Sequence, residues 1–172
     1  MYCPKCGYNK FGENSQKSFH CSKCGFLFYF NAAAAVVGII FNDNNEVLLT
    51  TRKHDPFAGM LDFPGGFIEY NESAEEGLKR ELKEELNVDV CEMNYFATLP
   101  NIYTYAGVTY HTLDIAYICH IPNLTDIKPD DDITDFSFVK PEQIDLNKIG
   151  LNSPKEFIKL YINQKSRFEQ QR

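Results

Sequence analysis

The chain has 172 residues, with 17 Lys and Arg against 24 Asp and Glu, so its formal charge is −7, and 44% of its residues are hydrophobic. This length suits one ordinary domain with a small addition, and no apolar run approaches the roughly 18 residues that would span a bilayer, which argues against a membrane protein. The acidic balance argues against broad nucleic-acid binding, because that binding depends on Lys and Arg neutralising phosphates.

The N-terminus predicts the compartment in which the protein works. Residues 1–6, Met-Tyr-Cys-Pro-Lys-Cys, lack the basic start, the apolar middle and the small-residue cleavage site of a signal peptide. We therefore expect a cytoplasmic protein whose thiols are kept reduced.

Four of the six cysteines form two Cys-x-x-Cys pairs, Cys3 with Cys6 and Cys21 with Cys24, and a glycine follows each pair. Two such pairs supply the four sulfur ligands of a tetrahedral structural zinc. A reducing compartment disfavours disulfides, and the absence of a βαβ pattern disfavours a redox role. Because sulfur would fill all four coordination positions, this zinc is expected to be structural and unable to activate water.

After the cysteine pairs the sequence takes on the pattern of a β-sheet. We expect strands over 26–30, 32–41 and 46–52, with the last two joined as a hairpin by turn-forming residues. A loop is expected over 53–60, and Pro64-Gly65-Gly66 predicts a sharp turn. Further strands are expected over 88–99, 102–105, 108–121 and 135–140. Two single cysteines in this part, Cys91 and Cys119, are expected to be buried small side chains.

One segment between the strands is strongly helical. Ser73 and Glu76 form a capping box at its start, and Asn87 offers a left-handed stop at its end. Apolar residues recur at every fourth position between them, at Ala74, Leu78, Leu82 and Leu86. A second helix is expected to begin at Ser153-Pro154. These elements predict an α+β fold in which a mixed β-sheet is packed between helices.

Three carboxylates lie on one face of the first predicted helix, because Glu81, Glu84 and Glu85 have i, i+3, i+4 spacing. Like charges at this spacing destabilise a helix unless cations lie among them, and hard divalent ions such as Mg²⁺ prefer oxygen ligands of this kind. A solvated acidic face is the ordinary alternative, and the three glutamates by themselves favour it.

The sequence around this helix resembles the Nudix box, which is a glycine, five residues, Glu, seven residues and then Arg-Glu-apolar-x-Glu-Glu-x-Gly-apolar. Here it runs from Gly66 through Glu72 to the segment 80–88, Arg-Glu-Leu-Lys-Glu-Glu-Leu-Asn-Val. Only the closing glycine differs, and Asn87 is the second-best residue for a left-handed helix end. Residues 1–30 are similar to the zinc ribbon that precedes the catalytic domain of NADH pyrophosphatases. The resemblance implies two domains, a zinc ribbon over 1–30 and a Nudix hydrolase domain over 31–172.

The resemblance also implies a catalytic set on matching positions. The implied catalytic residues are Glu72, Arg80, Glu81, Glu84 and Glu85. The last three, with the carbonyl of Gly65, would bind Mg²⁺ or Mn²⁺, and Arg80 would pair with Glu72 or, equally well, with Glu84. The general base stays open. It also stays open whether an acidic residue of a later loop adds a metal ligand, the candidates being Asp130, Asp131, Asp132 and Asp135.

The implied reaction is hydrolysis of the diphosphate linkage between a nucleoside and a second group, as in ADP-ribose or NADH, by a metal-activated water. The residues that bind the substrate stay open, because the Ser-Gln-Pro-Trp type array of NADH pyrophosphatases is replaced here by 98–101, Thr-Leu-Pro-Asn, and the chain has no Trp. The aromatic residues available to stack on a base are Phe57, Tyr103, Tyr105 and Tyr110.

The expected partner is a small-molecule nucleotide. Capped RNA ends stay open as substrates, and so does a homodimer. The alternative function is a nucleotide-sensing or nucleic-acid- or protein-binding module in which the zinc ribbon recruits the partner. A sensor is expected to lose metal carboxylates, whereas this chain keeps Glu81, Glu84 and Glu85.

Overall fold

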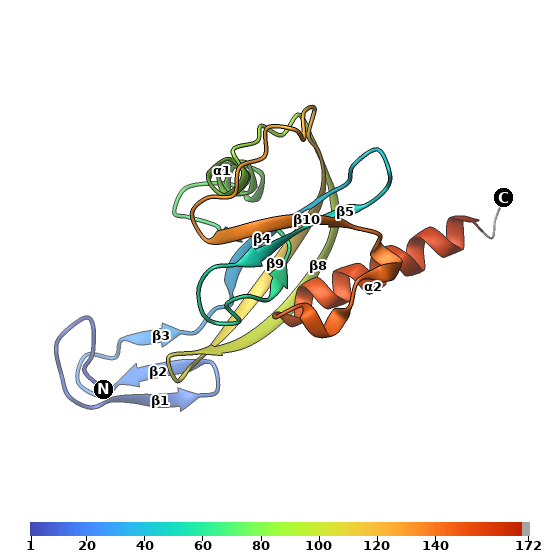
Figure 1. Ribbon diagram of the computed structural model, residues 1–172. Helices are drawn as coiled ribbons and strands as arrows, with labels where there is room; N and C mark the ends of the chain where they lie inside the picture. Colours follow the sequence, from blue (N-terminus) through green and yellow to red (C-terminus); the bar gives the residue numbers. More distant parts are fainter. Residues whose placement is uncertain (170–172) are drawn as a thin grey trace. The chain divides into compact units, whose positions relative to one another are not determined.

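The computed structural model of the protein describes residues 1–169, in two compact units (Figure 1). The first unit is Met1–Ala32, and the second begins at Ala33. In the first unit a three-stranded antiparallel sheet has the order β1-β2-β3. Its strands are β1 (Phe11–Ser15), β2 (Ser18–Cys21) and β3 (Leu27–Tyr29). Its buried hydrophobic residues are few, Cys3, Phe11 and Cys21, with Phe19 and Phe26 packed against them.

The second unit contains two sheets and two α-helices. The larger sheet has the order β7-β4-β9-β8, and only its β4–β9 pair is parallel, so it is a mixed sheet. The smaller sheet has the order β10-β5-β6. The strands are β4 (Ala33–Ile40), β5 (Val47–Arg52), β6 (Leu61–Asp62), β7 (Gly65–Phe67), β8 (Glu92–Tyr105), β9 (Val108–His120) and β10 (Ile133–Val139). The helices are α1 (Ala74–Leu86), α2 (Asn152–Glu169) and two short 3-10 helices, η1 (Pro141–Gln143) and η2 (Leu146–Lys148).

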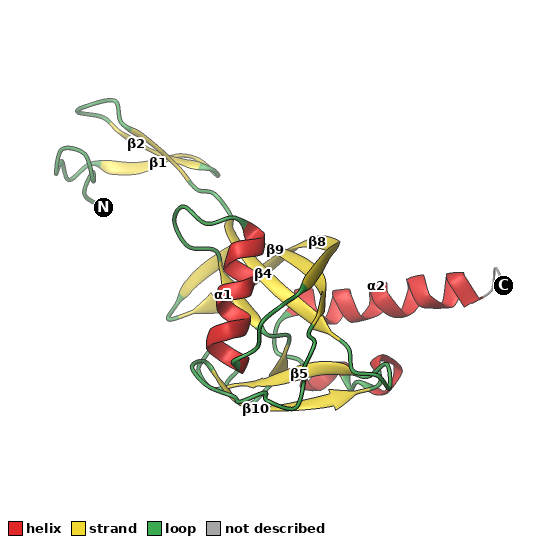
Figure 2. Ribbon diagram, turned by 90° about the horizontal axis from the view of Figure 1, so that it is seen from above, coloured by secondary structure: helices red, strands yellow, loops and turns green. Residues whose placement is uncertain are grey.

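The larger sheet lies between the two α-helices (Figure 2). Val36 and Ile40 of β4 belong to one buried cluster with the leucines of α1, whereas Val37 and Ile39 belong to another with Phe157 of α2. This division follows from the alternation of side chains along a strand. The predicted α+β fold, a mixed sheet packed between helices, is therefore confirmed. Within the described chain, no helix combines the length and apolarity needed to cross a bilayer.

Three local predictions are wrong. The turn after β4 forms, since Asn42 N–H donates to the Glu46 carbonyl at 3.0 Å, but β5 then pairs with β10 in the other sheet instead of continuing a hairpin. The two strands expected over 88–99 and 102–105 are the single strand β8, because Pro100, which lacks an N–H, is tolerated on this edge strand. The expected turn at Gly65 and Gly66 is the short strand β7, which pairs with β4.

Candidate active site

The two ends of α1 fix which way its glutamates face. At the start, the Ser73 hydroxyl accepts from Glu76 N–H at 3.2 Å, and the Glu76 carboxylate accepts from Ser73 N–H at 2.8 Å, so the predicted capping box is confirmed. At the end, Asn87 has φ 56° and ψ 34°, the predicted left-handed stop. The buried leucines Leu78, Leu82 and Leu86 then hold one face of α1 against the sheet.

Arg80 ties the loop before α1 to the helix. Its guanidinium donates to both oxygens of Glu72, at 2.7 and 3.2 Å, and to the Phe67 carbonyl at 3.0 Å. Such two-point contacts to a carboxylate are among the stronger hydrogen bonds in proteins. They hold the pKa of Glu72 below its ordinary value. Arg80 also donates to Glu81 and Glu84, each at 2.9 Å, so the Glu72 and Glu84 contacts considered in the sequence are both present.

The three glutamates of the predicted metal site have different surroundings. Glu84 is paired with Arg80 at the surface, whereas Glu85 is 5% exposed and accepts a hydrogen bond from Gly65 N–H at 2.8 Å. Burial, together with the charges of Glu81 and Asp62, raises the pKa of Glu85 to about 8. Among the described residues, these carboxylates do not gather three ligand atoms within 4.8 Å of one another. Hydrogen bonds from Arg80 and from Gly65 N–H engage one oxygen of each of these carboxylates.

Two glycines let these carboxylates lie against the sheet. Gly65 has φ +138°, and a Cβ there would be 2.1 Å from the Val36 carbonyl oxygen. A Cβ on Gly66 would be 2.5 Å from Glu81 Oε1. The Gly-Gly sequence is therefore required for close approach of backbone to backbone at Gly65 and of backbone to carboxylate at Gly66.

A cavity of about 330 Å³ opens beside Glu81 and Glu85. Its charged lining is mostly acidic, and Arg52 and His54 are the basic residues in it. The acidic lining residues are Asp55, Asp62, Glu69, Glu81, Glu85, Asp114 and Asp132. Of the four loop aspartates considered in the sequence, Asp132 is the one that lines this cavity.

Sequence reasoning missed the other polar residues of the cavity. Arg52 pairs with the buried Asp62 at 2.8 Å, yet burial raises the pKa of Asp62 to about 6. The β8–β9 side adds buried polar side chains, Asn101, Thr112 and Asp114. Ser153 of α2 is also buried, and its hydroxyl donates to Asp114. The signal in the sequence that could have indicated these cavity residues is the presence of polar residues inside strands that are otherwise apolar. The alternation over 108–121 predicts only one buried face, whereas β9 is a central strand and is buried on both faces.

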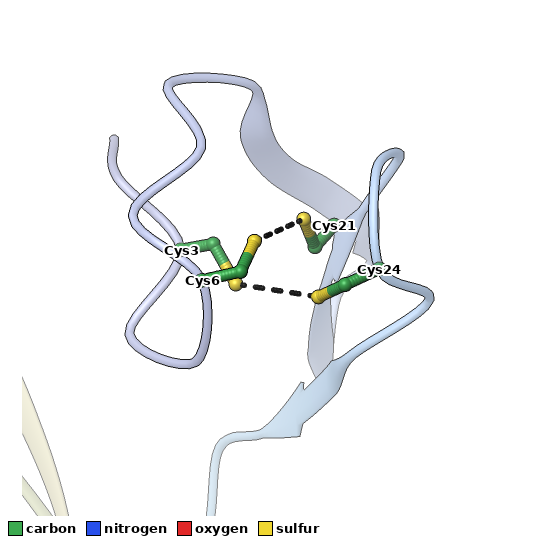
Figure 3. A group of neighbouring side chains, drawn as sticks. All are labelled: Cys3, Cys6, Cys21 and Cys24. Atoms are coloured by element: carbon green, nitrogen blue, oxygen red, sulfur yellow. Dashed lines mark hydrogen bonds between the residues drawn. The ribbon is translucent and has the colours of Figure 1, made fainter.

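The four cysteines of the first unit point their sulfur atoms at one another (Figure 3). The Cys3–Cys24 and Cys6–Cys21 sulfur distances are 3.8 and 3.7 Å, and all four sulfurs lie within 4.8 Å of one another. The edge of a tetrahedron of sulfurs about 2.3 Å from zinc is about 3.8 Å, so this donor set fits zinc. The single cysteines differ from each other: Cys119 is buried as predicted, but Cys91 is exposed, because it precedes β8 instead of lying within a strand.

The NUDIX domain family model matches residues 31–161. The NAD-capped RNA hydrolase NudC of Vibrio atlanticus is 29% identical over 142 residues, which are 74% of this chain and 52% of that protein. The ADP-ribose pyrophosphatase of Methanocaldococcus jannaschii is 48% identical over 60 residues, 35% of each chain. The chain thus spans about half or less of these relatives' lengths.

A solved structure supports the fold. The Nudix hydrolase from Nitrosomonas europaea superposes with a TM-score of 0.71 at 24% identity, covering 97% of this chain and 93% of that chain. At this identity the likeness concerns the fold alone.

Proposed function

The chain belongs to the Nudix family, and from that membership we propose that it hydrolyses the diphosphate linkage of a nucleoside diphosphate bonded to a second group, such as ADP-ribose or NADH. Nudix hydrolases use divalent metal. In this chain Glu81, Glu84, Glu85 and the Gly65 carbonyl would hold Mg²⁺ or Mn²⁺. The observation that carries the proposal is the acidic cavity, with seven carboxylates and few cations in its lining.

The charge of the cavity explains why a cation is needed. A diphosphate is itself anionic, so the carboxylates would repel it unless positive charge were placed between them. Oxygen ligands from Glu81, Glu84 and Glu85 suit a hard divalent cation. When bound, such a cation neutralises charge on the phosphate oxygens and lowers the pKa of a coordinated water.

Hydrogen bonds from Arg80 would hold the loop before α1 in place when the glutamates bind a cation. Arg80 would give up its contacts with Glu81 and Glu84 in favour of the cation, and its remaining hydrogen bonds to Glu72 and the Phe67 carbonyl would still hold the loop. Asp132 is the candidate for a further metal ligand, or for the general base, because it lines the same cavity.

The first unit would hold one structural Zn²⁺ through Cys3, Cys6, Cys21 and Cys24. Its role in the proposed function is to organise the segment 1–30, which has too small a core to fold alone. A cytoplasmic location, a homodimer and the domain limits 1–30 and 31–172 stay predictions of the sequence.

The test is turnover on a substrate panel with Mg²⁺ or Mn²⁺. The panel contains ADP-ribose, NADH, a diadenosine polyphosphate, nucleoside triphosphates and an NAD-capped RNA, the last because the Vibrio relative is named for that substrate. Glu85→Gln should lose most of the turnover, since it removes one ligand charge. Glu13→Gln is the matched control, because it removes the same charge from an exposed residue of the first unit.

Two outcomes would contradict the proposal: turnover that chelator leaves unchanged, or a Glu85→Gln protein as fast as the unmodified one. Binding of a nucleotide without turnover of any panel member would instead support the sensing module. Turnover of NAD-capped RNA alone would mean that the enzyme acts on RNA ends.

A further inference from the structure

The cavity beside the glutamates contains more carboxylates than the proposed metal site uses. Glu81 and Glu85 belong to that site, and Asp62 is paired with Arg52 at 2.8 Å. The lining carboxylates that remain are Asp55, Glu69, Asp114 and Asp132. Asp132 is the candidate for a further metal ligand, but the other three take part in no ion pair among the described residues. Their negative charge is complementary to a positive group in the ligand.

An unpaired side chain indicates that a ligand reaches the same part of the cavity. Asn101 is 3% exposed, lines the cavity, and has an Oδ1 atom without a hydrogen-bond partner. It lies opposite Thr112 in the β8–β9 pairing, and Asp114 is two residues further along β9, so the three side chains share one face of the sheet. Buried polar atoms are nearly always paired in folded proteins. An unpaired one at the wall of a cavity therefore indicates a group that fills this side when the ligand is bound.

The sheet places this side of the cavity within a substrate's length of the metal site. Gly66 of β7 lies against Glu81. Ala35 of β4 pairs with Phe67 of β7 on one side and with Asp114 of β9 on the other. Strands β7 and β9 are therefore two strand spacings apart, about 10 Å, and the small side chain of Ala35 leaves the space between them open. A diphosphate held at the glutamates would place the group bonded to it beside Asp114.

Asp114 offers charge more than free hydrogen-bonding positions. Its two oxygens already accept hydrogen bonds, one from the Thr112 hydroxyl at 2.6 Å and one from the Ser153 hydroxyl. Two aromatic side chains, Phe67 and Tyr103, line the same cavity. Aromatic faces attract cations through their ring electrons, and quaternary ammonium groups are recognised in this way. A cation without N–H donors therefore suits this lining.

From these observations we propose that the enzyme acts on diphosphates whose second group is a cation without N–H donors, either a quaternary ammonium or a pyridinium. The inference rests on the proposed function, since it names the charge of the second group in that substrate class. Asp55, Glu69 and Asp114 attract the positive charge, and Phe67 and Tyr103 contact it. A neutral second group lacks this attraction, and an anionic one is repelled.

Two pairs of substrates test the charge of the second group. NAD⁺ carries a positive charge on the nicotinamide ring that NADH lacks. CDP-choline is compared with its carbon isostere, in which a tert-butyl group replaces the trimethylammonium group. With saturating Mg²⁺, the cationic member of at least one pair should have a kcat/KM about tenfold or more above that of the neutral member, and the ratio should fall as salt is added.

The two pairs also identify the kind of cation. A preference in the NAD⁺ pair alone would assign a pyridinium, and a preference in the choline pair alone would assign a quaternary ammonium. Equal or reversed values of kcat/KM in both pairs would overturn the inference.

Variants that remove one charge separate charge selection from a structural role. Asp55→Asn and Glu69→Gln change exposed residues, and each should lower the cation-to-neutral ratio of kcat/KM by about threefold. Asp114→Asn should lower it further, because Asp114 is 4% exposed and its charge is less screened. A fold defect would affect both members of a pair alike, so the ratio reports charge selection. Asp43→Asn is the matched control, since Asp43 is exposed and lies outside the cavity lining. A ratio that none of the three variants changes would overturn the inference.

Binding separates this inference from the proposed function. The probes are choline and its tert-butyl isostere, and the N-methylated nicotinamide cation and neutral nicotinamide, none of which contains a diphosphate. They are titrated by saturation-transfer NMR with saturating Mg²⁺, so that the metal site is not free to bind them. At least one cation should bind about fivefold or more tightly than its neutral partner, and Asp114→Asn should remove most of this difference.

The outcomes for the two proposals are distinct. Hydrolysis of all four substrates at equal rates would overturn the charge selection and leave the proposed function standing. Hydrolysis of none, with a cation bound in preference, would overturn activity on these substrates and leave the charge selection standing. Hydrolysis of none without a preferred cation would overturn both.

Discussion

Gly66 lies so close to Glu81 that a Cβ at its position would be 2.5 Å from the carboxylate oxygen Oε1. The atom in the way is the far end of a flexible side chain, and Gly66 does not have a left-handed φ. The absence of a side chain at Gly66 therefore lets the Glu81 carboxylate lie where it does. A side chain at this position would displace the carboxylate and would leave the backbone conformation unstrained.

Gly66→Ala should therefore impair activity much more than stability. The Glu81 carboxylate would have to move by about 1 Å or more, and a displacement of that size in an active site costs about a hundredfold in rate. The measurement is kcat with saturating Mg²⁺, beside the thermal unfolding midpoint. Gly12→Ala is the control, because a Cβ at Gly12 would meet nothing within 4 Å. A fully active Gly66→Ala protein would show that the position of Glu81 does not matter for turnover.

Asn87 provides a test of the helix end. It is exposed and has φ 56°, a conformation that costs ordinary residues about 1–2 kcal/mol and glycine almost nothing. We expect Asn87→Ala to lower the free energy of unfolding by about 1 kcal/mol and Asn87→Gly to leave it unchanged or raise it slightly. Urea denaturation measures both. Equal stability of the Ala and Gly variants would mean that the left-handed stop does not stabilise α1.

Local signals in the sequence were enough to place α1 and its glutamates. Ser73, Glu76 and Asn87 act on their own helix, so the capping box and the left-handed end follow from a few adjacent residues. The resemblance to the Nudix box predicted Glu72 as a partner of Arg80. Local helix signals do not indicate this pair, because Glu72 lies eight residues away across a loop.

The residues on the β8–β9 side of the cavity could not be predicted from the sequence pattern. Asn101, Thr112 and Asp114 are brought to the cavity by the parallel pairing of β4 with β9 and by the edge position of β8. Those pairings depend on long-range contacts, and alternation along one strand cannot show whether one face or both will be buried. For the same reason β5 was expected to pair with β4 through the turn between them, whereas its main partner, β10, comes about 80 residues later.

Tyr117 links β9 to the start of α1 and predicts a response to alkaline pH. It is 7% exposed, its hydroxyl donates to Glu75 at 2.8 Å, and burial raises the pKa of the phenol to about 12. The ordinary value is about 10, so between pH 10 and 12 the folded protein keeps a proton that the unfolded chain has lost. The stabilisation is therefore complete below pH 10 and is lost as the pH rises to 12.

The variant that tests this is Tyr117→Phe. At pH 8 it should be about 1 kcal/mol less stable than the unmodified protein, because it loses a hydrogen bond to a carboxylate. The difference in stability should shrink between pH 10 and 12, because only the unmodified protein has a phenol here whose ionisation is less favourable in the folded state than in the unfolded state. Urea denaturation at pH 8 and pH 11 checks both points, and a difference that stays constant with pH would contradict the argument.

The first unit should depend on zinc. We expect about one zinc per chain by elemental analysis, retained after dialysis that strips Mg²⁺, as for four-cysteine coordination. Cys21→Ser should lose the metal, and the first unit should become sensitive to protease, because Cys21 is one of the few buried residues that organise it. The second unit should keep its thermal transition, since its two buried clusters contain none of those residues. Cys91→Ser makes the same chemical change at an exposed position and should keep the zinc. A zinc-free preparation whose first unit still resists protease would show that the four cysteines organise it without metal.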